Sequence, residues 1–292
     1  MAKRILLFAA VNLLIIVTLT IVLGLLGVGN YLTRAGIDYS SLFIFCLVWG
    51  FGGAFLSLAM SRVMAKLMLG VKVIDPDTAN AQERALLEMV HRLARSAHLP
   101  AMPEVGWYDS DEVNAFATGP SSRRALVAVS AGLLRRMSPE HLEAVLGHEV
   151  THIANGDMVT MTLLQGVVNV FVMFFARVIA YFAAQFARED TRPLVNFLVT
   201  IVLEIAFSSL GLIVVAWFSR QREFRADRGG AQLAGREHMI GALRALQSTL
   251  ELVDNRQHSL ATLKISGKPG AAVSLFATHP PLEQRIAALQ QG

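Results

Sequence analysis

Four apolar runs constrain what this chain can fold into more than any other feature of its sequence. They cover residues 5–29, 41–60, 158–187 and 194–218. At a rise of about 1.5 Å per residue, each can cross the ~30 Å hydrocarbon core of a bilayer as a helix. Hydrophobic residues make up 54% of the chain, charged residues only 16%, and the mean hydropathy is +0.49. We therefore expect a multi-pass membrane protein.

Basic residues that flank the first two runs predict their orientation. Lys3 and Arg4 precede the first run, and Arg62 and Lys66 follow the second. The positive-inside rule therefore places both termini and the soluble parts in the cytoplasm. A cleaved signal peptide is the alternative for the first run, but the run is longer than a typical signal-peptide core and lacks an A-x-A site. The single Cys46 excludes an intrachain disulfide, which fits a cytosolic soluble part.

The apolar runs divide the chain into four parts. We expect transmembrane hairpins at 1–70 and 158–218, and the two halves of a cytosolic domain at 71–157 and 219–292. The predicted fold class is an α+β integral membrane protein that is predominantly helical. It would have about four transmembrane helices and a soluble domain with a small sheet.

Short strands and amphipathic helices are expected in the soluble halves. Residues 105–108, 113–119 and 125–129 have strand-like composition, and 81–97 carries apolar residues at helical spacing. Pro281 suits the first position of a final helix. An exposed strand beside a catalytic metal can take substrate by β-addition, so 113–119 is a candidate substrate-binding edge. An ordinary internal strand is the alternative.

The motif His148-Glu149-x-x-His152 is the main candidate for chemistry. Residues four apart lie one turn above each other on a helix, so both imidazoles can reach one metal ion. Glu149 lies beside them and can act as a general base without ligating the ion. The helix itself is well signalled, because Ser138-Pro139 provides an N-cap and a first-turn proline.

A second pair of acids follows the fourth apolar run directly. If the helix continues, Glu223 and Asp227 lie four apart on one face. Glu223 can then be the third metal ligand, and Asp227 can accept a hydrogen bond from a ligating imidazole. A solvated charged face is the alternative. Two apolar runs separate His152 from Glu223, so the chain leaves the cytoplasm and returns, which allows the two halves to meet. If Glu223 is not a ligand, His279 is the next candidate.

These motifs together resemble the HtpX-type membrane zinc metalloproteases, which are gluzincins related to the CAAX prenyl proteases. The resemblance covers nearly the whole chain and rests on separated elements in one order. They are the two N-terminal spans, Asn114-Ala-Phe-Ala-Thr-Gly119, His148-Glu149-x-x-His152-x-x-Asn155-Gly156-Asp157, two more spans, Glu223-x-x-x-Asp227 and His279-Pro280-Pro281-x-x-x-Arg285.

The resemblance implies a catalytic metal centre. His148, His152 and Glu223 would bind one Zn²⁺ per chain, Glu149 would be the catalytic base, and Asp227 would support a ligand. Three protein ligands leave the fourth position of the metal open, as a catalytic zinc site requires.

The resemblance also implies roles outside the ligand set. Asn114 would lie on the edge strand that pairs with the substrate backbone. His279 would help to stabilise the tetrahedral intermediate, and Arg285 would hold the local charge network. Bacterial members of the family are multi-pass inner-membrane proteases that degrade misfolded or damaged membrane proteins under stress. The implied partners are polypeptide substrates, chiefly membrane proteins, and the lipid bilayer.

Other readings remain open on the sequence. A dedicated processing protease of CAAX type is one alternative, and a non-enzymatic adaptor with a structural metal site is another. A structural site would normally be closed by four ligands, often cysteines, and the only cysteine is Cys46. The basic residues do not form a patch interleaved with aromatic residues, so the sequence gives no sign of nucleic-acid binding. Arg177 and Glu204 interrupt the last two runs; they can pair, or Arg177 can snorkel and Glu204 line a wet cavity.

Overall fold

The chain divides into two compact units, which are described separately. The computed structural model describes residues 2–25, 31–33, 36–257 and 277–291. One unit consists of Met1–Leu58 and Thr160–Val215, and the other of Ala59–Val159 and Ala216–Gly292.

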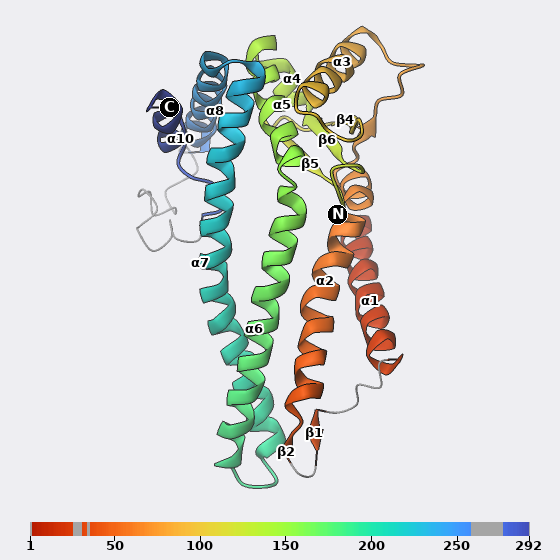
Figure 1. The fold of residues 1–292 in the computed structure, drawn as a ribbon, viewed down its shortest axis with the longest axis vertical. Coiled ribbons are helices and arrows are strands. Elements are labelled where there is room, and N and C mark those ends of the chain that lie inside the picture. Colours follow the sequence, from red (N-terminus) through yellow and green to blue (C-terminus); the bar gives the residue numbers. More distant parts are fainter. Residues whose placement is uncertain (1, 26–30, 34–35, 258–276, 292) are drawn as a thin grey trace. The chain divides into compact units, whose positions relative to one another are not determined.

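The first unit is built from long helices (Figure 1). Three helices are long and apolar enough to cross a membrane: α2 (Tyr39–Met68), α6 (Asp157–Gln185) and α7 (Arg192–Ala234). α1 (Ala2–Leu25) is also a helix, and Leu13–Leu25 is an apolar part of it. Three of the four expected spans are therefore present as long apolar helices, and the N-terminal span stays a prediction.

Helices α2 and α6 approach closely because small residues face each other. A Cβ atom at Gly50 would lie 3.0 Å from the backbone nitrogen of Val170 and 3.2 Å from the carbonyl oxygen of Gly166. The glycines thus allow backbone-to-backbone packing where lipid provides no hydrophobic driving force. A two-stranded hairpin of β1 (Leu32–Thr33) and β2 (Gly36–Ile37) belongs to the same unit.

The second unit contains a four-stranded sheet in the order β3-β4-β6-β5. β4 (Glu104–Tyr108) runs parallel to β6 (Leu126–Ser130), while β3 (Lys72–Val73) and β5 (Ala115–Thr118) pair antiparallel at the two edges. The predicted segments 105–108, 113–119 and 125–129 contain most of β4, all of β5 and most of β6. The short β3 was not predicted, because two residues carry no recognisable alternation.

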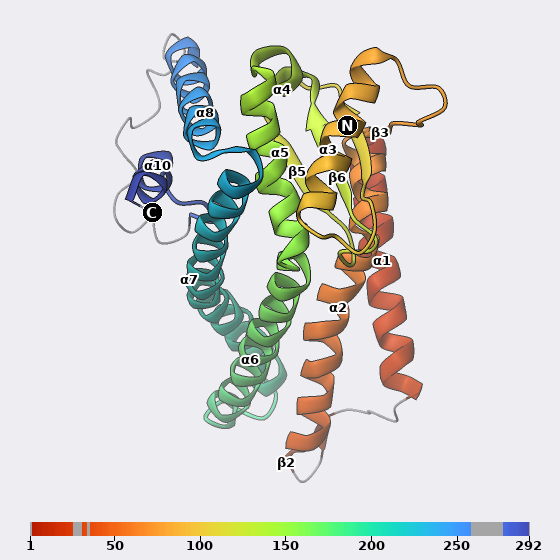
Figure 2. The same cartoon turned by 45° about the horizontal axis from the view of Figure 1, so that its top comes forward.

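Helices α3 (Ala81–Ser96), α4 (Ala131–Arg136) and α5 (Pro139–Ala154) contact this sheet (Figure 2). Helix α8 (Arg236–Gln257) packs against α5, and α10 (Leu282–Gln291) packs against α8. α5 is central, because it contacts α3, β5 and α8. The prediction of a mostly helical α+β protein with a small sheet is confirmed.

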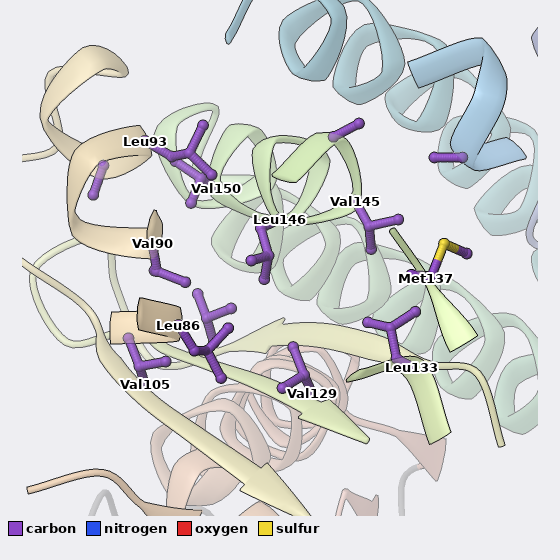
Figure 3. Close-up of a cluster of buried hydrophobic side chains, with 14 of the residues drawn as sticks. Leu86, Val90, Leu93, Val105, Val129, Leu133, Met137, Val145, Leu146 and Val150 are labelled. Carbon is purple, nitrogen blue, oxygen red and sulfur yellow. The ribbon is translucent and has the colours of Figure 1, made fainter. Parts of the chain in front are cut away.

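The main core of this unit lies between α3, α5 and one face of the sheet (Figure 3). Val90 and Leu93 on α3 and Leu146 and Val150 on α5 are all at most 1% exposed. Burying each such side chain contributes roughly 1.5–3 kcal/mol, so the apolar face of α5 is held firmly against its neighbours. The opposite side of α5 is then free to present polar groups from a rigid support.

Candidate metal centre

The His148 helix begins and ends where its local sequence predicts. The Ser138 Oγ accepts a hydrogen bond from the His141 amide at 3.3 Å, and Pro139 is the first helical residue. Asn155 is the C-cap, and Gly156 follows with a φ of +66°. Such a conformation favours glycine and stops the helix. α5 therefore carries both histidines in its last turns, supported by the buried core.

Helix α7 brings the second pair of acids to the same place. It continues past its apolar run, so Glu223 and Asp227 lie one turn apart on its buried face. Gly230 permits this approach: a Cβ atom there would lie 3.0 Å from the His148 backbone nitrogen and 3.3 Å from the Ala144 carbonyl oxygen. A larger residue at this position would push α7 away from α5.

Three potential ligand atoms converge between these helices. One nitrogen of His148, one of His152 and one carboxylate oxygen of Glu223 lie within 4.8 Å of one another. The two Nε2 atoms are 3.1 Å apart, and they lie 3.5 Å and 3.4 Å from the Glu223 carboxylate. Within the described residues, this is the one group of three or more such side chains that could hold a metal ion.

Each imidazole is held from behind by a separate carboxylate. Nδ1 of His148 lies 2.9 Å from Asp227 Oδ1, and Nδ1 of His152 lies 2.7 Å from Asp157 Oδ2. Both carboxylates are at most 2% exposed. Hydrogen bonds of this kind fix the tautomer that carries the proton on Nδ1, which directs the Nε2 lone pairs inward. Asp157 lies at the end of the His148–Asp157 motif, and its contact with His152 was not predicted from the sequence.

Arg285 and His279 complete the network from the C-terminal segment. Arg285 donates to Asp227 through Nε at 2.7 Å and through Nη2 at 2.5 Å, and its Nη1 lies 3.6 Å from Glu223 Oε2. Nδ1 of His279 lies 3.0 Å from the same Glu223 oxygen, while its side chain is 62% exposed. His279 thus lies at the open side of the cluster.

The atoms at the centre of the cluster fit a cation. With Nδ1 of each imidazole donating outward, two nitrogen lone pairs and a carboxylate face one another. Oε1 of Glu223 is buried and accepts no hydrogen bond from the described residues. Such an enclosed acceptor is costly without a partner. Two imidazole nitrogens and one carboxylate oxygen are ligands that zinc takes readily.

The carboxylates around the two imidazoles also raise the pKa of both. Burial alone would lower the pKa of His148, but hydrogen bonds with Asp227 and Glu223 outweigh it and raise the pKa to about 9. For His152, the hydrogen bond with Asp157 and the neighbouring Glu223 carboxylate likewise outweigh burial and raise the pKa. The surroundings favour positive charge between these side chains, which a metal ion would supply in place of protons.

A carboxylate and a strand edge lie close to this centre. Glu149 follows His148 on α5 and is half-buried, and no hydrogen bond or ion pair engages its carboxylate within the described residues. β5 packs against α5 and has one neighbouring strand, β6, within the described sheet. Asn114 directly precedes β5, and its amide donates to the Ser130 Oγ at 3.1 Å. Its backbone is thereby fixed at the start of the open edge.

A model of the M48 peptidases, described as "Peptidase family M48", matches residues 80–292. The chain belongs to peptidase family M48. The proteins named "Protease HtpX homolog" from Bacillus subtilis and Bacillus velezensis are each 54% identical to it, over 99% of both chains. "Protease HtpX" from Thioalkalivibrio sulfidiphilus is 52% identical, over 99% of this chain and 98% of that one.

The fold also has a solved counterpart. The crystal structure of S. mikatae Ste24p superposes with a TM-score of 0.67 at 18% identity. The match covers 99% of this chain, which spans 64% of the Ste24p chain. At this identity the likeness concerns the fold alone.

Membership of the M48 family and the long apolar helices make this protein a membrane metalloprotease. The family implies polypeptide substrates and a metal cofactor, typically zinc. The predicted resemblance to HtpX-type proteases is confirmed, and the CAAX-type and adaptor alternatives are not favoured.

Proposed function

We propose that this protein is a zinc endopeptidase of the bacterial inner membrane. His148, His152 and Glu223 would hold one zinc ion per chain, and Glu149 would act as the general base. The observation that carries the proposal is the convergence of His148, His152 and Glu223 within 4.8 Å of one another, with a buried Glu223 oxygen that accepts no hydrogen bond from the described residues. Glu149, whose carboxylate has no hydrogen bond or ion pair within the described residues, follows His148 directly.

The chain's own side chains can carry the proton transfers of peptide hydrolysis. When bound, zinc would polarise the scissile carbonyl and make a water molecule more acidic. Glu149 would accept the proton of that water and later deliver it to the leaving amine. Asp227 and Asp157 would keep both imidazoles oriented with Nε2 inward, from hydrogen-bond distances of 2.9 Å and 2.7 Å.

Other residues would position the substrate and its developing charge. The open edge of β5, which begins after Asn114, would pair with an extended peptide backbone. His279 is exposed beside Glu223 and would donate to the oxyanion of the tetrahedral intermediate. Arg285 would hold the Asp227 carboxylate in place through its two hydrogen bonds.

The topology supports substrates that emerge from the membrane. Two long apolar helices, α6 and α7, separate His152 from Glu223 in the chain. Two crossings return the chain to the side it left, and the basic residues before the first run and after the second favour the cytoplasm for the catalytic domain. We infer that the protein degrades misfolded or damaged membrane proteins as part of a stress response.

The first test measures bound zinc and casein cleavage in parallel for wild type, Glu149→Gln and Glu223→Ala. Wild type should hold one zinc per chain and cleave. Glu149→Gln should keep the metal and lose cleavage, whereas Glu223→Ala should lose both. Glu143→Gln, on the same helix and paired with Arg92 at 2.8 Å, is the control and should behave as wild type. Cleavage by Glu149→Gln at the wild-type rate would refute the assignment of the base.

A second test concerns the substrate class. The protein would be reconstituted in vesicles with a destabilised membrane protein and, separately, with a soluble fragment carrying the same cleavage site. Preferential cleavage of the membrane-embedded form is expected. Equal rates on both forms would count against membrane-protein quality control while leaving the peptidase chemistry intact.

A further inference from the structure

Helix α7 has two different faces after its apolar run ends at Phe218. The face towards the domain interior carries Glu223 and Asp227, each 1% exposed. The other face carries side chains that recur every three or four residues and share one side of the helix. These are Trp217, Gln221, Phe224, Arg225 and Arg228. Apart from Arg225, which lies 3.7 Å from Asp157, this surface of α7 has no hydrogen bond or ion pair with the residues around the metal centre within the described part of the chain.

This surface is hollowed where α7 faces the C-terminal helix α10. A cavity of about 520 Å³ is lined by Trp217, Phe218, Phe224, Arg225, Arg228 and Ala288. A second hollow of about 190 Å³ continues from it and shares Arg228 and Ala288. We call the larger hollow the aromatic–arginine groove. Aromatic side chains line it at the end nearer the apolar run, and arginines line it further along the helix.

The two arginines of the groove have charge to offer a ligand. Arg228 is exposed and has no hydrogen bond or ion pair within the described residues. Arg225 has one carboxylate nearby, with Asp157 Oδ1 at 3.7 Å, and its side chain is 55% exposed. Guanidinium groups bind phosphate oxygens through paired donors, so two neighbouring arginines form a suitable phosphate site.

The position of the groove along α7 matches the boundary of a bilayer. Trp217 and Phe218 are 51% and 42% exposed at the end of the apolar run, where aromatic residues favour the interface. Arg225 follows Phe218 by about 10 Å of helix rise, but long helical side chains lean back towards the N-terminus. Its guanidinium can therefore reach the headgroup region, which is about 5–7 Å deep in each leaflet.

We propose that the aromatic–arginine groove binds an anionic phospholipid of the leaflet that faces the catalytic domain. Arg225 and Arg228 would hold the headgroup phosphate, and Trp217 and Phe218 would contact the glycerol and upper acyl carbons. The groove lies on the opposite face of α7 from Glu223, so a lipid there would not occupy the metal centre. The proposal requires a membrane-embedded chain and is independent of the peptidase mechanism.

Native mass spectrometry of the full-length protein tests this directly. The protein would carry Glu149→Gln to prevent self-cleavage, and it would be released from nanodiscs made of equal parts phosphatidylglycerol and phosphatidylcholine. Retention of phosphatidylglycerol over phosphatidylcholine is expected. Arg225→Gln/Arg228→Gln should lower this preference, on the order of fivefold for each arginine. If the double variant does not fold, Arg228→Gln alone gives the same test at half the charge change.

Arg95→Gln/Arg244→Gln is the matched control, because both arginines are exposed and have no side-chain partner within the described residues. This variant should keep the wild-type preference. Equal retention of phosphatidylglycerol by the groove variant and wild type would overturn the proposal, as would an equal loss in the control. Excess inorganic phosphate should not displace the lipid. Displacement would indicate a site for free anions and would also overturn the proposal.

Discussion

Two clusters of charged side chains in this protein differ in whether their charges and hydrogen-bond acceptors are satisfied. In the membrane-spanning unit, Arg177 donates from Nη1 to Glu204 Oε1 at 2.5 Å and to the Met173 carbonyl at 3.1 Å. Its guanidinium also lies over the Phe45 ring, 5.3 Å from the centroid. One cation meets one anion, so the Arg177–Glu204 pair balances itself. This observation decides between the two readings that the sequence left open for Glu204.

The metal centre is different, because its carboxylates and imidazoles do not satisfy one another. Arg285 neutralises Asp227, but the two Nε2 atoms still face each other at 3.1 Å and Glu223 Oε1 accepts no hydrogen bond from the described residues. Both clusters contain an arginine in contact with a carboxylate. Unsatisfied acceptors that converge on one point distinguish the candidate metal centre from the Arg177–Glu204 pair, which links α6 to α7.

The largest expected effect concerns the balanced pair. Arg177→Met leaves Glu204 without a partner, and an uncompensated charge in an apolar setting costs about 3 kcal/mol. The double variant Arg177→Met/Glu204→Met removes both charges and should recover most of that stability. Unfolding in mild detergent would be followed by the loss of helical circular dichroism. A double variant no more stable than Arg177→Met would show that the two residues do not form a self-contained pair.

Substitutions at the candidate metal centre should have the opposite effect. They should weaken zinc binding while leaving the free energy of unfolding nearly unchanged. Asp157→Asn weakens the support behind His152, and loss of such a partner typically lowers metal affinity 10–100-fold. Asp227→Asn should act similarly on His148. Competition with a fluorescent zinc chelator at fixed pH measures the affinity. Asp111→Asn, in an exposed pair with Arg135, is the control. Wild-type zinc affinity in Asp157→Asn would remove Asp157 from the centre.

Local signals made the helices of the site predictable. The Ser138 cap, Pro139 and the Asn155-Gly156 stop all act within a few residues, and they fix the ends of α5. The helical continuation of α7 as far as Asp227 also follows from the chain itself, because residues 219–228 contain neither glycine nor proline. The helix then continues through Gly229 and Gly230 and ends at Ala234, before Gly235 with a φ of +101°. The predicted spacing of the motif residues then follows from helix geometry.

Contacts between residues on either side of a helix break, and the pairing of strands, could not be predicted from the sequence. Asp157 reaches His152 because Gly156, with a φ of +66°, interrupts the helix between α5 and α6. No helical spacing indicates a contact between residues five apart across such a turn. The parallel pairing of β4 with β6 and the position of β5 at the edge likewise depend on tertiary packing. The sequence suggested that 113–119 is a strand but could not say that it has an open side.

The smallest expected effect comes from a third cluster, in the unit that contains the four-stranded sheet, where the charged side chains are partly exposed. Glu104 on β4 forms ion pairs with Arg62 and with Lys66, whose Nζ lies at 2.7 Å. Burial acts to raise the pKa of Glu104, but the hydrogen bonds from Lys66 and Arg62 outweigh it and lower the pKa below 4.5. The stability that these pairs contribute is therefore present at neutral pH and is lost as the pH falls through the lowered pKa.

Solvent should keep this contribution small, because the Glu104 side chain is 37% exposed. Glu104→Gln should lower the free energy of unfolding slightly at neutral pH, by less than about 1 kcal/mol. The difference from wild type should shrink towards about pH 4. Thermal unfolding at both pH values measures this. Glu237→Gln, at an exposed glutamate without an ion pair in the described residues, controls for the loss of one charge. If Glu104→Gln lowered the free energy of unfolding at neutral pH by as much as Arg177→Met, solvent exposure would not weaken the Glu104 cluster. The contrast with the Arg177–Glu204 pair would then fail.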